Sequence, residues 1–500
     1  MAGHRKQVAG HCSIQSPNHS LVQLTECSGN IIDTAVGAFL SGFPLHGEVL
    51  AAFRGNRIAE SRRTTSVSSP PKPAGSFSRW IGAKAPVFRQ ENYRKYFGGQ
   101  LISVVGTWVA QIAQSWLVLT LTDSPMLLGL VPVFQFGPTI LFGLWGGLVA
   151  DRFPKRQIMI TTLTASSLLQ FILAALILSG HIELWHVFAI ASLLGVVQAF
   201  DTPARQAFAS ELVPRDQLVQ AVSLNSAVFN AGRLVGPALG GLLLALVGPG
   251  WCFTLNGFTF FAVIIQLMRM DQTKLFSPLG RRSGGTSREG IAFIRSNRTI
   301  MLIILMMGFV TTFSMAFSVW MPLLARDVLD RGAGGFGILM SMLGFGAMVG
   351  GLALAFAGSR RPSAKVIPLT AGALGATCMV IGLAGLASAN LVVFLMILPI
   401  AGFMQTFTAS LSNSSVQIQA PDELRGRVIS NYFMVFNTGL PLGALIAGAT
   451  AEWFGMPGSI LTGGAIAFTA SIVVAYLGRV SQRTGAIEPS VEVIAEKPAD

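Results

Sequence analysis

Apolar runs of twenty or more residues recur between positions 97 and 478, and no other feature restricts the fold of this chain so strongly. A helix rises about 1.5 Å per residue, so each run can cross a hydrocarbon core of about 30 Å. The runs are too long and too continuously apolar for the alternating strands of a membrane β-barrel. Composition agrees, because 52% of the residues are hydrophobic and only 11% are charged. The sequence therefore predicts an all-α integral membrane protein.

The runs divide into twelve predicted transmembrane helices with short connections, which leave little room for an inserted enzyme domain. The nucleotide-binding pattern Gly-x-x-x-x-Gly-Lys-[Ser/Thr] is absent, since no Gly-Lys pair occurs in the sequence, and so is the metal-binding pattern His-Glu-x-x-His. We therefore expect no enzyme activity, no cofactor and no metal. The predicted spans lie near residues 97–121, 126–149, 157–180, 184–208, 217–247, 251–270, 299–323, 335–357, 365–387, 390–415, 427–452 and 458–478.

The distribution of basic residues predicts how the chain is oriented in the membrane. The net charge is +13, and the loops on the other side offer only Arg326 and Arg331. Because Lys and Arg accumulate in cytoplasmic loops, both termini are predicted to be cytoplasmic in an inner or plasma membrane, and no nucleic-acid partner is expected. The basic residues in or beside alternate loops are Arg152, Lys155, Arg156, Arg215, Arg269, Lys274, Arg281, Arg282, Arg288, Arg295, Arg298, Arg360, Arg361, Lys365, Arg425 and Arg427.

The chain divides into five predicted segments. The first, residues 1–88, is rich in Ser, Arg, Gly and Pro and is predicted to be a disordered basic tail. An alternative is a mis-assigned start codon, since the body reads as complete from about Phe88. A six-helix half at 89–270 and a second one at 299–480 flank a cytoplasmic linker at 271–298, in which residues 286–298 predict a short amphipathic helix. Residues 481–500 are predicted to form a second disordered tail.

An internal repeat relates the two predicted halves. With an offset of 207 residues, the fourth predicted span falls on the tenth and the fifth falls on the eleventh without a gap. Two related halves with a path between them are typical of alternating access, so we expect a transporter. The matched pairs are Gly195 with Gly402, Gln198 with Gln405, Phe200 with Phe407, Pro214 with Pro421, Ser223 with Ser430, Phe229 with Phe436, Asn230 with Asn437, Gly232 with Gly439, Gly236 with Gly443, Gly241 with Gly448, and Gly248 with Gly455.

The first cytoplasmic loop carries a motif that begins at Gly147 and reads Gly-Leu-Val-Ala-Asp-Arg-Phe-Pro-Lys-Arg. The glycine can let helices approach, and the carboxylate can meet a helix end or a cation. The motif resembles the signature loop of the major facilitator superfamily, with Pro154 in place of the usual second glycine, and the resemblance implies a conformational latch. The alternative is that the basic charges only fix topology. The candidate latch residues in this loop are Gly147, Asp151, Arg152, Lys155 and Arg156.

Two charged residues stand four apart in the fourth span, Asp201 and Arg205. This spacing favours an ion pair on one helix face, and charges at membrane depth are usually paired and functional. The superfamily resemblance implies that Asp201 joins the latch, and Asp201 is also the best candidate for a proton-binding group. Alternatively, the span ends at Phe200, Asp201 is the N-cap of a cytoplasmic helix and Pro203 is an early residue of that helix.

The fifth span contains a glycine-rich motif with a central proline, which resembles the antiporter motif of drug-exporting facilitators. Ser223 replaces the leading glycine of that pattern. The resemblance favours export, whereas small residues alone would indicate close helix packing. Arg233 is embedded in the motif and is expected to face either a cavity or the neighbourhood of Asp201. The motif residues are Gly232, Arg233, Gly236, Pro237, Gly240 and Gly241.

Several phrases between residues 88 and 480 resemble the facilitator subfamily that includes the enterobactin exporter. They begin at Asn92, Ala199, Asn225 and Leu424. The resemblance implies proton-driven efflux of a small molecule such as a siderophore, drug or metabolite, by a protein expected to be a monomer. An uptake permease and a non-transporting receptor or scaffold remain as alternatives. A resemblance to a subfamily does not identify the substrate.

Polar residues inside the spans are candidates for a substrate cavity, because each is polar where lipid excludes polar groups. Hydrogen bonding between helices explains any one of them equally well. The candidates are Gln111, Gln114, Gln135, Asn225, Asn230, Gln405, Asn413 and Asn437.

Overall fold

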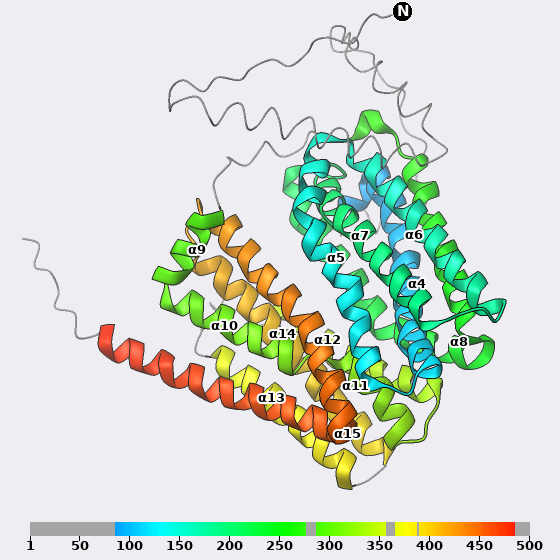
Figure 1. Ribbon diagram of the computed structural model, residues 1–500. Coiled ribbons are helices and arrows are strands. Elements are labelled where there is room, and N and C mark those ends of the chain that lie inside the picture. Colours follow the sequence, from blue (N-terminus) through cyan, green and yellow to red (C-terminus); the bar gives the residue numbers. More distant parts are fainter. Residues whose placement is uncertain (1–85, 277–286, 357–365, 388–389, 486–500) are drawn as a thin grey trace, which may run out of the picture. The chain divides into compact units, whose positions relative to one another are not determined.

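The computed structural model describes residues 86–276, 287–356, 366–387 and 390–485, and the two predicted tails lie almost entirely outside them. Every regular element in the described residues is helical, as predicted (Figure 1). The helices are α4 (Glu91–Leu121), α5 (Pro125–Arg152), α6 (Lys155–Leu178), α7 (Leu184–Ala209), α8 (Leu218–Met268), α9 (Ser287–Ser296), α10 (Arg298–Phe313), α11 (Phe317–Leu323), α12 (Ala333–Phe356), α13 (Val366–Ala387), α14 (Leu391–Gln419) and α15 (Arg425–Gly485). Short 3-10 turns occur at Pro86–Arg89, Arg215–Gln217 and Gln272–Lys274, and a π-helical turn occurs at Leu324–Val328.

Ten of the described helical segments are long and apolar enough to cross a membrane. The two longest, α8 with 51 residues and α15 with 61 residues, each contain one glycine with non-helical backbone angles. Division of both helices at these glycines would give the predicted twelve spans. The count of twelve and the cytoplasmic side of the termini stay predictions.

The two non-helical glycines are Gly248, with φ of 81°, and Gly455, with φ of 68°. This left-handed conformation costs glycine little and other residues more, and a proline follows within two positions in both cases, at Pro249 and Pro457. Figure 1 shows the chain reversing where the orange segment of α15 meets the red one. The two glycines are one of the pairs matched by the internal repeat, so the repeat extends to backbone conformation.

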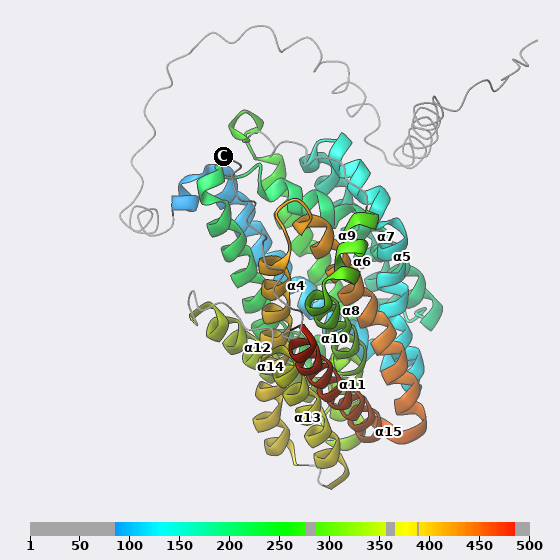
Figure 2. The same cartoon turned by 90° about the vertical axis from the view of Figure 1, so that its left-hand side faces the viewer.

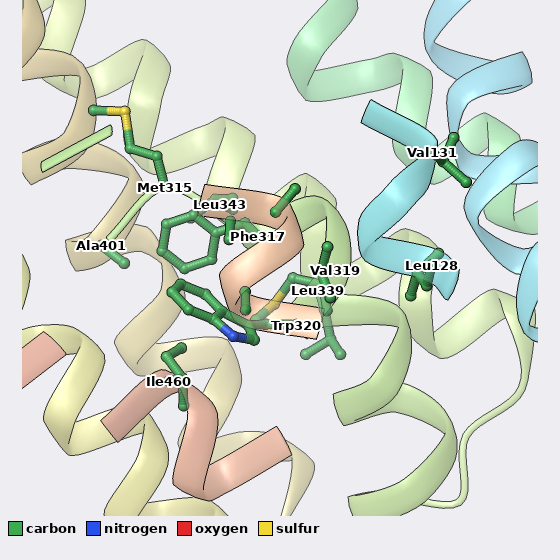
Figure 3. Packing of buried hydrophobic residues seen from close by; sticks show 14 of the residues in the cluster. Leu128, Val131, Met315, Phe317, Val319, Trp320, Leu339, Leu343, Ala401 and Ile460 are labelled. Carbon is green, nitrogen blue, oxygen red and sulfur yellow. The ribbon is translucent and has the colours of Figure 1, made fainter. Parts of the chain in front are cut away.

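The seventh predicted span, 299–323, is broken in the structure. Helix α10 ends at Phe313, and α11 begins at Phe317 after three residues outside regular helix. The buried Trp320 holds α11 in place by donating from Nε1 to the Ser459 hydroxyl at 2.9 Å. Figure 3 shows Trp320 and Phe317 packed near Ile460 of α15. Irregular backbone at membrane depth is tolerated where it is enclosed by protein or lines a cavity.

The helices pack in two groups, which we call the amino-terminal group (α4–α8) and the carboxy-terminal group (α10–α15) (Figure 2). In the first group α8 packs on α4 and α6, and α5 packs on α7. In the second, α15 packs on α10 and α13, and α12 packs on α14. The two most extensive contacts between the groups are those of α8 with α12 and of α15 with α5. The two longest helices, α8 and α15, are therefore each packed against helices of both groups.

Glycines at matched positions of the repeat make matched contacts. A Cβ at Gly195 of α7 would lie 2.1 Å from the Gln135 carbonyl oxygen of α5, and a Cβ at Gly402 of α14 would lie 1.9 Å from the Leu343 carbonyl oxygen of α12. Only glycine permits such close approach of two helix backbones. The repeat found in the sequence thus corresponds to repeated packing in three dimensions.

Candidate functional site

A cavity of about 320 Å³ lies between the two helix groups. Its lining comes from α4, α5 and α8 on one side and from α11, α12, α14, α15 and the break before α11 on the other. Most lining side chains are apolar. The lining residues are Trp108, Gln111, Gln114, Ser115, Leu128, Val131, Pro132, Gln135, Phe136, Phe229, Arg233, Met315, Ala316, Phe317, Ser318, Met340, Leu343, Gln405, Phe436 and Leu440.

The predicted cavity residues divide into two sets. Four glutamines, Gln111, Gln114, Gln135 and Gln405, are among the lining residues. The four asparagines are not among them. Asn230 and Asn437 each donate to a carbonyl one turn earlier, those of Ser226 and Phe433 respectively. Asn413 accepts a hydrogen bond from Gln417, and Asn225 lies half-buried elsewhere on α8. Hydrogen bonds within their own helices account for three of these asparagines, whereas the alternative predicted from the sequence was hydrogen bonding between helices.

Arg233 faces the cavity, and its direction could not be decided from the sequence. Its Nη2 donates to the amide oxygen of Gln405 at 2.6 Å, and its Nη1 lies 3.4 Å from the hydroxyl of Thr406. Both partners belong to α14, so this contact joins the two groups. Among the residues that line the cavity, Arg233 is the only charged one.

The glycine-rich motif of α8 is used on two faces. Gly232, Gly236 and Gly240 face α4, where a Cβ at Gly236 would lie 2.4 Å from Cβ of Trp108. Gly241 faces α12, where its Cβ would lie 2.7 Å from Cα of Gly337. The motif therefore packs α8 tightly within its own group and also against the other group.

Pro237 adds a contact between the groups. A proline within a helix has no N–H to donate to the carbonyl four residues earlier. For Pro237 this is the carbonyl of Arg233, which is therefore left without its usual donor. A Cβ at Gly344 of α12 would lie 2.4 Å from this oxygen, so the glycine backbone approaches the freed carbonyl directly. Weak C–H donation to such an oxygen stabilises close helix pairs by about 0.5–1 kcal/mol.

Asp201 and Arg205 form the predicted ion pair, with 2.7 Å between Nη2 of Arg205 and Oδ2 of Asp201. Nε of Arg205 also donates to this carboxylate at 2.8 Å, and the Thr162 hydroxyl donates to it at 2.7 Å. Nη1 of Arg205 donates to Oε1 of Gln100 at 2.6 Å. The network is enclosed by α4, α6 and α7 and is not part of the cavity lining.

The alternative interpretation of Asp201 as an N-cap is wrong. Helix α7 continues through Pro203 to Ala209, so Asp201 lies within a helix. The carbonyl freed by Pro203 belongs to Ala199, and a Cβ at Gly146 of α5 would lie 1.9 Å from its oxygen. Close approach of α5 at this point compensates for the interrupted helix.

In the loop motif the structure separates residues that the sequence groups together. Lys155 forms an ion pair with Glu211 at 3.2 Å, and Arg156 donates to the carbonyls of Leu267 and Met268 at 2.6 and 3.2 Å. These contacts attach the start of α6 to the ends of α7 and α8. A Cβ at Gly147 would meet open space, so this glycine does not make the predicted close helix contact. The preceding residue, Gly146, makes it instead, against α7. One residue turns a helix face by about 100°, which the sequence pattern did not resolve.

Asp151 and Arg152 are exposed at the end of α5. Asp151 makes no hydrogen bond or ion pair with any residue that the structure describes, whereas Arg152 does have a partner. A free carboxylate at this position is available to bind a partner in another state of the molecule.

We expect Asp151→Asn to insert normally into the membrane and to lose most transport, because the substitution removes the charge and keeps the size of the side chain. Transport into vesicles and the yield of folded protein after extraction would test this. Asp216→Asn, a change at an exposed carboxylate of a neighbouring turn, is the matched control. Full transport by the Asp151 variant would exclude the latch role.

A second set of polar contacts connects the beginning of α4 with the end of α8. Asn92, which is 3% exposed, donates to the Asp271 carbonyl at 2.8 Å and accepts from the Asp271 backbone N–H at 3.1 Å. Hydrogen bonds from the Thr273 hydroxyl and backbone N–H lower the pKa of the Asp271 carboxyl. These contacts give a structural role to the phrase that begins at Asn92.

At one end of the cavity, charged side chains bridge the two groups through helix termini. The Glu452 carboxylate accepts from the Ser124 hydroxyl at 2.8 Å and from the Met126 backbone N–H at 3.1 Å, at the start of α5. Arg326 donates to the Leu119 carbonyl at 3.2 Å, at the end of α4, and to Asp123 at 3.1 Å. An acid at a helix N-terminus and a base at a C-terminus both complement the helix dipole. We call these contacts the bridged end.

Sequence reasoning missed several of these residues. Gln100, Thr162 and Glu211 give no signal of their own, because their roles depend on charges elsewhere in the chain. Glu452 gives no local signal either, because its partners Ser124 and Met126 lie in a distant part of the chain. Residues 315–318 enter the cavity only because the helix breaks there, and neither glycine nor proline marks the break.

Comparisons with known proteins agree with this architecture. The family model described as "Transmembrane secretion effector" matches residues 81–498. The chain is 24% identical over 362 residues to the staphyloferrin A transporter of Staphylococcus aureus, covering 72% of this chain and 90% of that protein. It is 24% identical over 357 residues to the enterobactin exporter of Shigella boydii, with 71% and 84% covered, and 21% identical over 390 residues to macrolide efflux protein A of Streptococcus pyogenes, with 77% and 95% covered.

Solved structures support the fold. A bacterial homolog of the human lysosomal transporter Spinster, in an inward-facing conformation, aligns with a TM-score of 0.60 at 14% identity, covering 79% of this chain and 97% of that one. The nucleoside transporter NupG aligns with a TM-score of 0.60 at 12% identity, covering 78% and 99%. The chain is thus a multi-pass integral membrane transporter and not an enzyme. It belongs to the transmembrane secretion effector family of the major facilitator superfamily.

Proposed function

We propose that this protein exports a small molecule from the cytoplasm by alternating access, driven by the proton gradient and without a cofactor. The observation that carries the proposal is the cavity, because its lining comes from both helix groups while polar contacts join the groups at the bridged end. A site with this placement can change its access when the groups move relative to each other.

Two further points concern the closed side of the cavity and the direction of transport. The bridged end lies at the α4–α5 connection, opposite to the basic α5–α6 connection that is predicted to be cytoplasmic, so the bridged end would be the outer one. Two of the relatives compared above are named as an exporter and an efflux protein. The names of these relatives favour outward movement of the substrate, whereas a closed outer end belongs to the cycle of an exporter and of an importer alike.

Proton coupling is assigned to Asp201 in this proposal. The cavity lining contains no carboxylate, and Asp201 and Glu211 are the buried acids among the described residues. Protonation of Asp201 would weaken its attraction for Arg205 and so change how α7 is held against α4 and α6. A proton could in this way alter helix packing without entering the cavity.

Everted membrane vesicles from an expressing strain test the proposal, with a panel of fluorescent dyes, siderophores and macrolides. We expect at least one compound to accumulate inside respiring vesicles and to leak out when a protonophore is added. Vesicles with the empty vector are the control. Loss of a preloaded compound from the vesicles in place of accumulation would indicate uptake, and no movement of any compound would favour a non-transporting receptor.

A further inference from the structure

We propose that Arg233 and Gln405 form a subsite for a negatively charged group, so that the substrate is an organic anion with an apolar portion. This inference rests on the proposed function, since it names the substrate class of the same cavity. It goes beyond the relatives, whose names include substrates of different chemistry.

The first argument is the charge of Arg233. A basic side chain near the middle of a membrane helix costs about 2.5–3.5 kcal/mol on insertion scales, so it is usually paired. Two other cations that are largely shielded from solvent in the amino-terminal group follow this rule: Arg205 binds Asp201, and Lys155 binds Glu211. The partners of Arg233 within the described structure are the neutral side chains of Gln405 and Thr406, and none is a carboxylate.

The second argument is the supply of hydrogen-bond donors. A guanidinium has five N–H donors, and the contacts to α14 use one nitrogen for Gln405 and another for Thr406. Because the oxygen of Gln405 accepts from Arg233, its amide nitrogen remains as a donor. A carboxylate has acceptors only and can bind a guanidinium through two parallel hydrogen bonds. The subsite therefore matches an anion better than a cation.

The third argument is the apolar surface next to the charge. Trp108 and Phe229 have ring centroids 5.7 Å apart, and both line the cavity together with Arg233. Gly232 and Gly236, on either side of Arg233 in sequence, leave the space that Trp108 occupies. The motif thus positions an aromatic surface beside the cation. A cavity of about 320 Å³ exceeds the needs of an inorganic ion and falls in the range of organic ligands.

Equilibrium binding to the purified full chain in lipid nanodiscs tests the inference without any assumption about direction or coupling. Two probes share a xanthene ring system and differ in charge: carboxyfluorescein is an anion and rhodamine 6G is a cation. We expect the wild type to bind carboxyfluorescein at least tenfold more tightly than rhodamine 6G, a difference of about 1.4 kcal/mol.

Three variants make the test specific to Arg233. Arg233→Gln should weaken carboxyfluorescein binding at least about tenfold. Gln405→Glu places a carboxylate beside the guanidinium and should have the same effect while Arg233 is still present. Lys274→Gln removes an exposed cation far from the cavity lining and should bind like the wild type.

Each result has a defined meaning. Failure of the wild type to bind carboxyfluorescein, equal binding of both probes, or unchanged binding by Arg233→Gln overturns the anion subsite. Monodisperse elution of each variant in size-exclusion chromatography shows that a loss of binding is not a loss of fold. Export of a cationic compound in the vesicle assay would leave the proposed function intact while overturning this inference, so the two failures are distinguishable.

Discussion

Replacement of Asp201 with alanine is expected to remove most of the folded protein from the membrane. The carboxylate accepts hydrogen bonds from Nε of Arg205 and from the Thr162 hydroxyl, lies 2.7 Å from Nη2 of Arg205, and belongs to a residue that is 9% exposed. Its loss leaves the guanidinium of Arg205 buried without an anionic partner, beside the neutral side chains of Gln100 and Tyr96. Breaking a buried ion pair from one side destabilises a protein by about 3–5 kcal/mol, a large part of the usual stability of a domain.

Thermal unfolding and the yield of monodisperse protein measure this effect. The double variant Asp201→Asn with Arg205→Gln should recover much of the loss, because no uncompensated charge remains. Asp216→Ala, at an exposed carboxylate, should behave like the wild type. An Asp201→Ala protein that keeps Arg205 and unfolds at the wild-type temperature would contradict this prediction. It would show that water or lipid headgroups solvate the network in spite of its enclosure by three helices.

The second large effect is expected at the contact between α8 and α12. Gly241→Leu should abolish transport while leaving both helix groups folded, because a Cβ at Gly241 would already lie 2.7 Å from Cα of Gly337 and 2.9 Å from the Ala333 carbonyl. A leucine there forces the groups apart at the proposed outer end. Its residue partner in the repeat, Gly448, meets Pro125 and Gly129 of α5 in the same way, so Gly448→Leu should give the same result.

Labelling of an introduced cysteine measures separation of the groups. Ser124→Cys lies at the bridged end and should react faster with a membrane-impermeant maleimide in the Gly241→Leu background than alone. Gly137→Leu, where a Cβ would meet open space, is the control. Unchanged labelling together with full transport would show that this contact does not have to close during the cycle.

Much of the fold could be predicted from the sequence because each span carries its own apolar signal and because the two halves repeat. The offset of 207 residues pairs Gly241 with Gly448, and the structure gives both the same kind of contact, one to α12 and one to α5. The pair Gly248 and Gly455 likewise shares a left-handed backbone. A glycine that recurs at one offset reports a three-dimensional constraint, since few other residues could replace it.

The cavity was predictable only in part. The glutamines that line the cavity, such as Gln111 and Gln405, are as polar as the asparagines that do not line it. Which of these side chains reach the cavity depends on the rotation of each helix about its axis, and a single residue does not encode that rotation. The asparagine side chain is shorter and reaches the carbonyl of its own preceding turn, as Asn230 and Asn437 do. Arg233 could not be placed without knowledge of α14. The bridged end depends on loops from opposite groups, and no local pattern relates Glu452 to Ser124.

The bridged end has a consequence for the speed of the transport cycle. Glu452 and Asp123 are exposed, and a charge at an exposed helix terminus contributes about 0.3–1 kcal/mol, comparable to thermal energy. Contacts of this strength orient the two groups but add little to the barrier for their separation. A modest preference of the cargo for one arrangement over the other is then enough to redistribute the molecule between them, and turnover need not wait for the rupture of a strong bond.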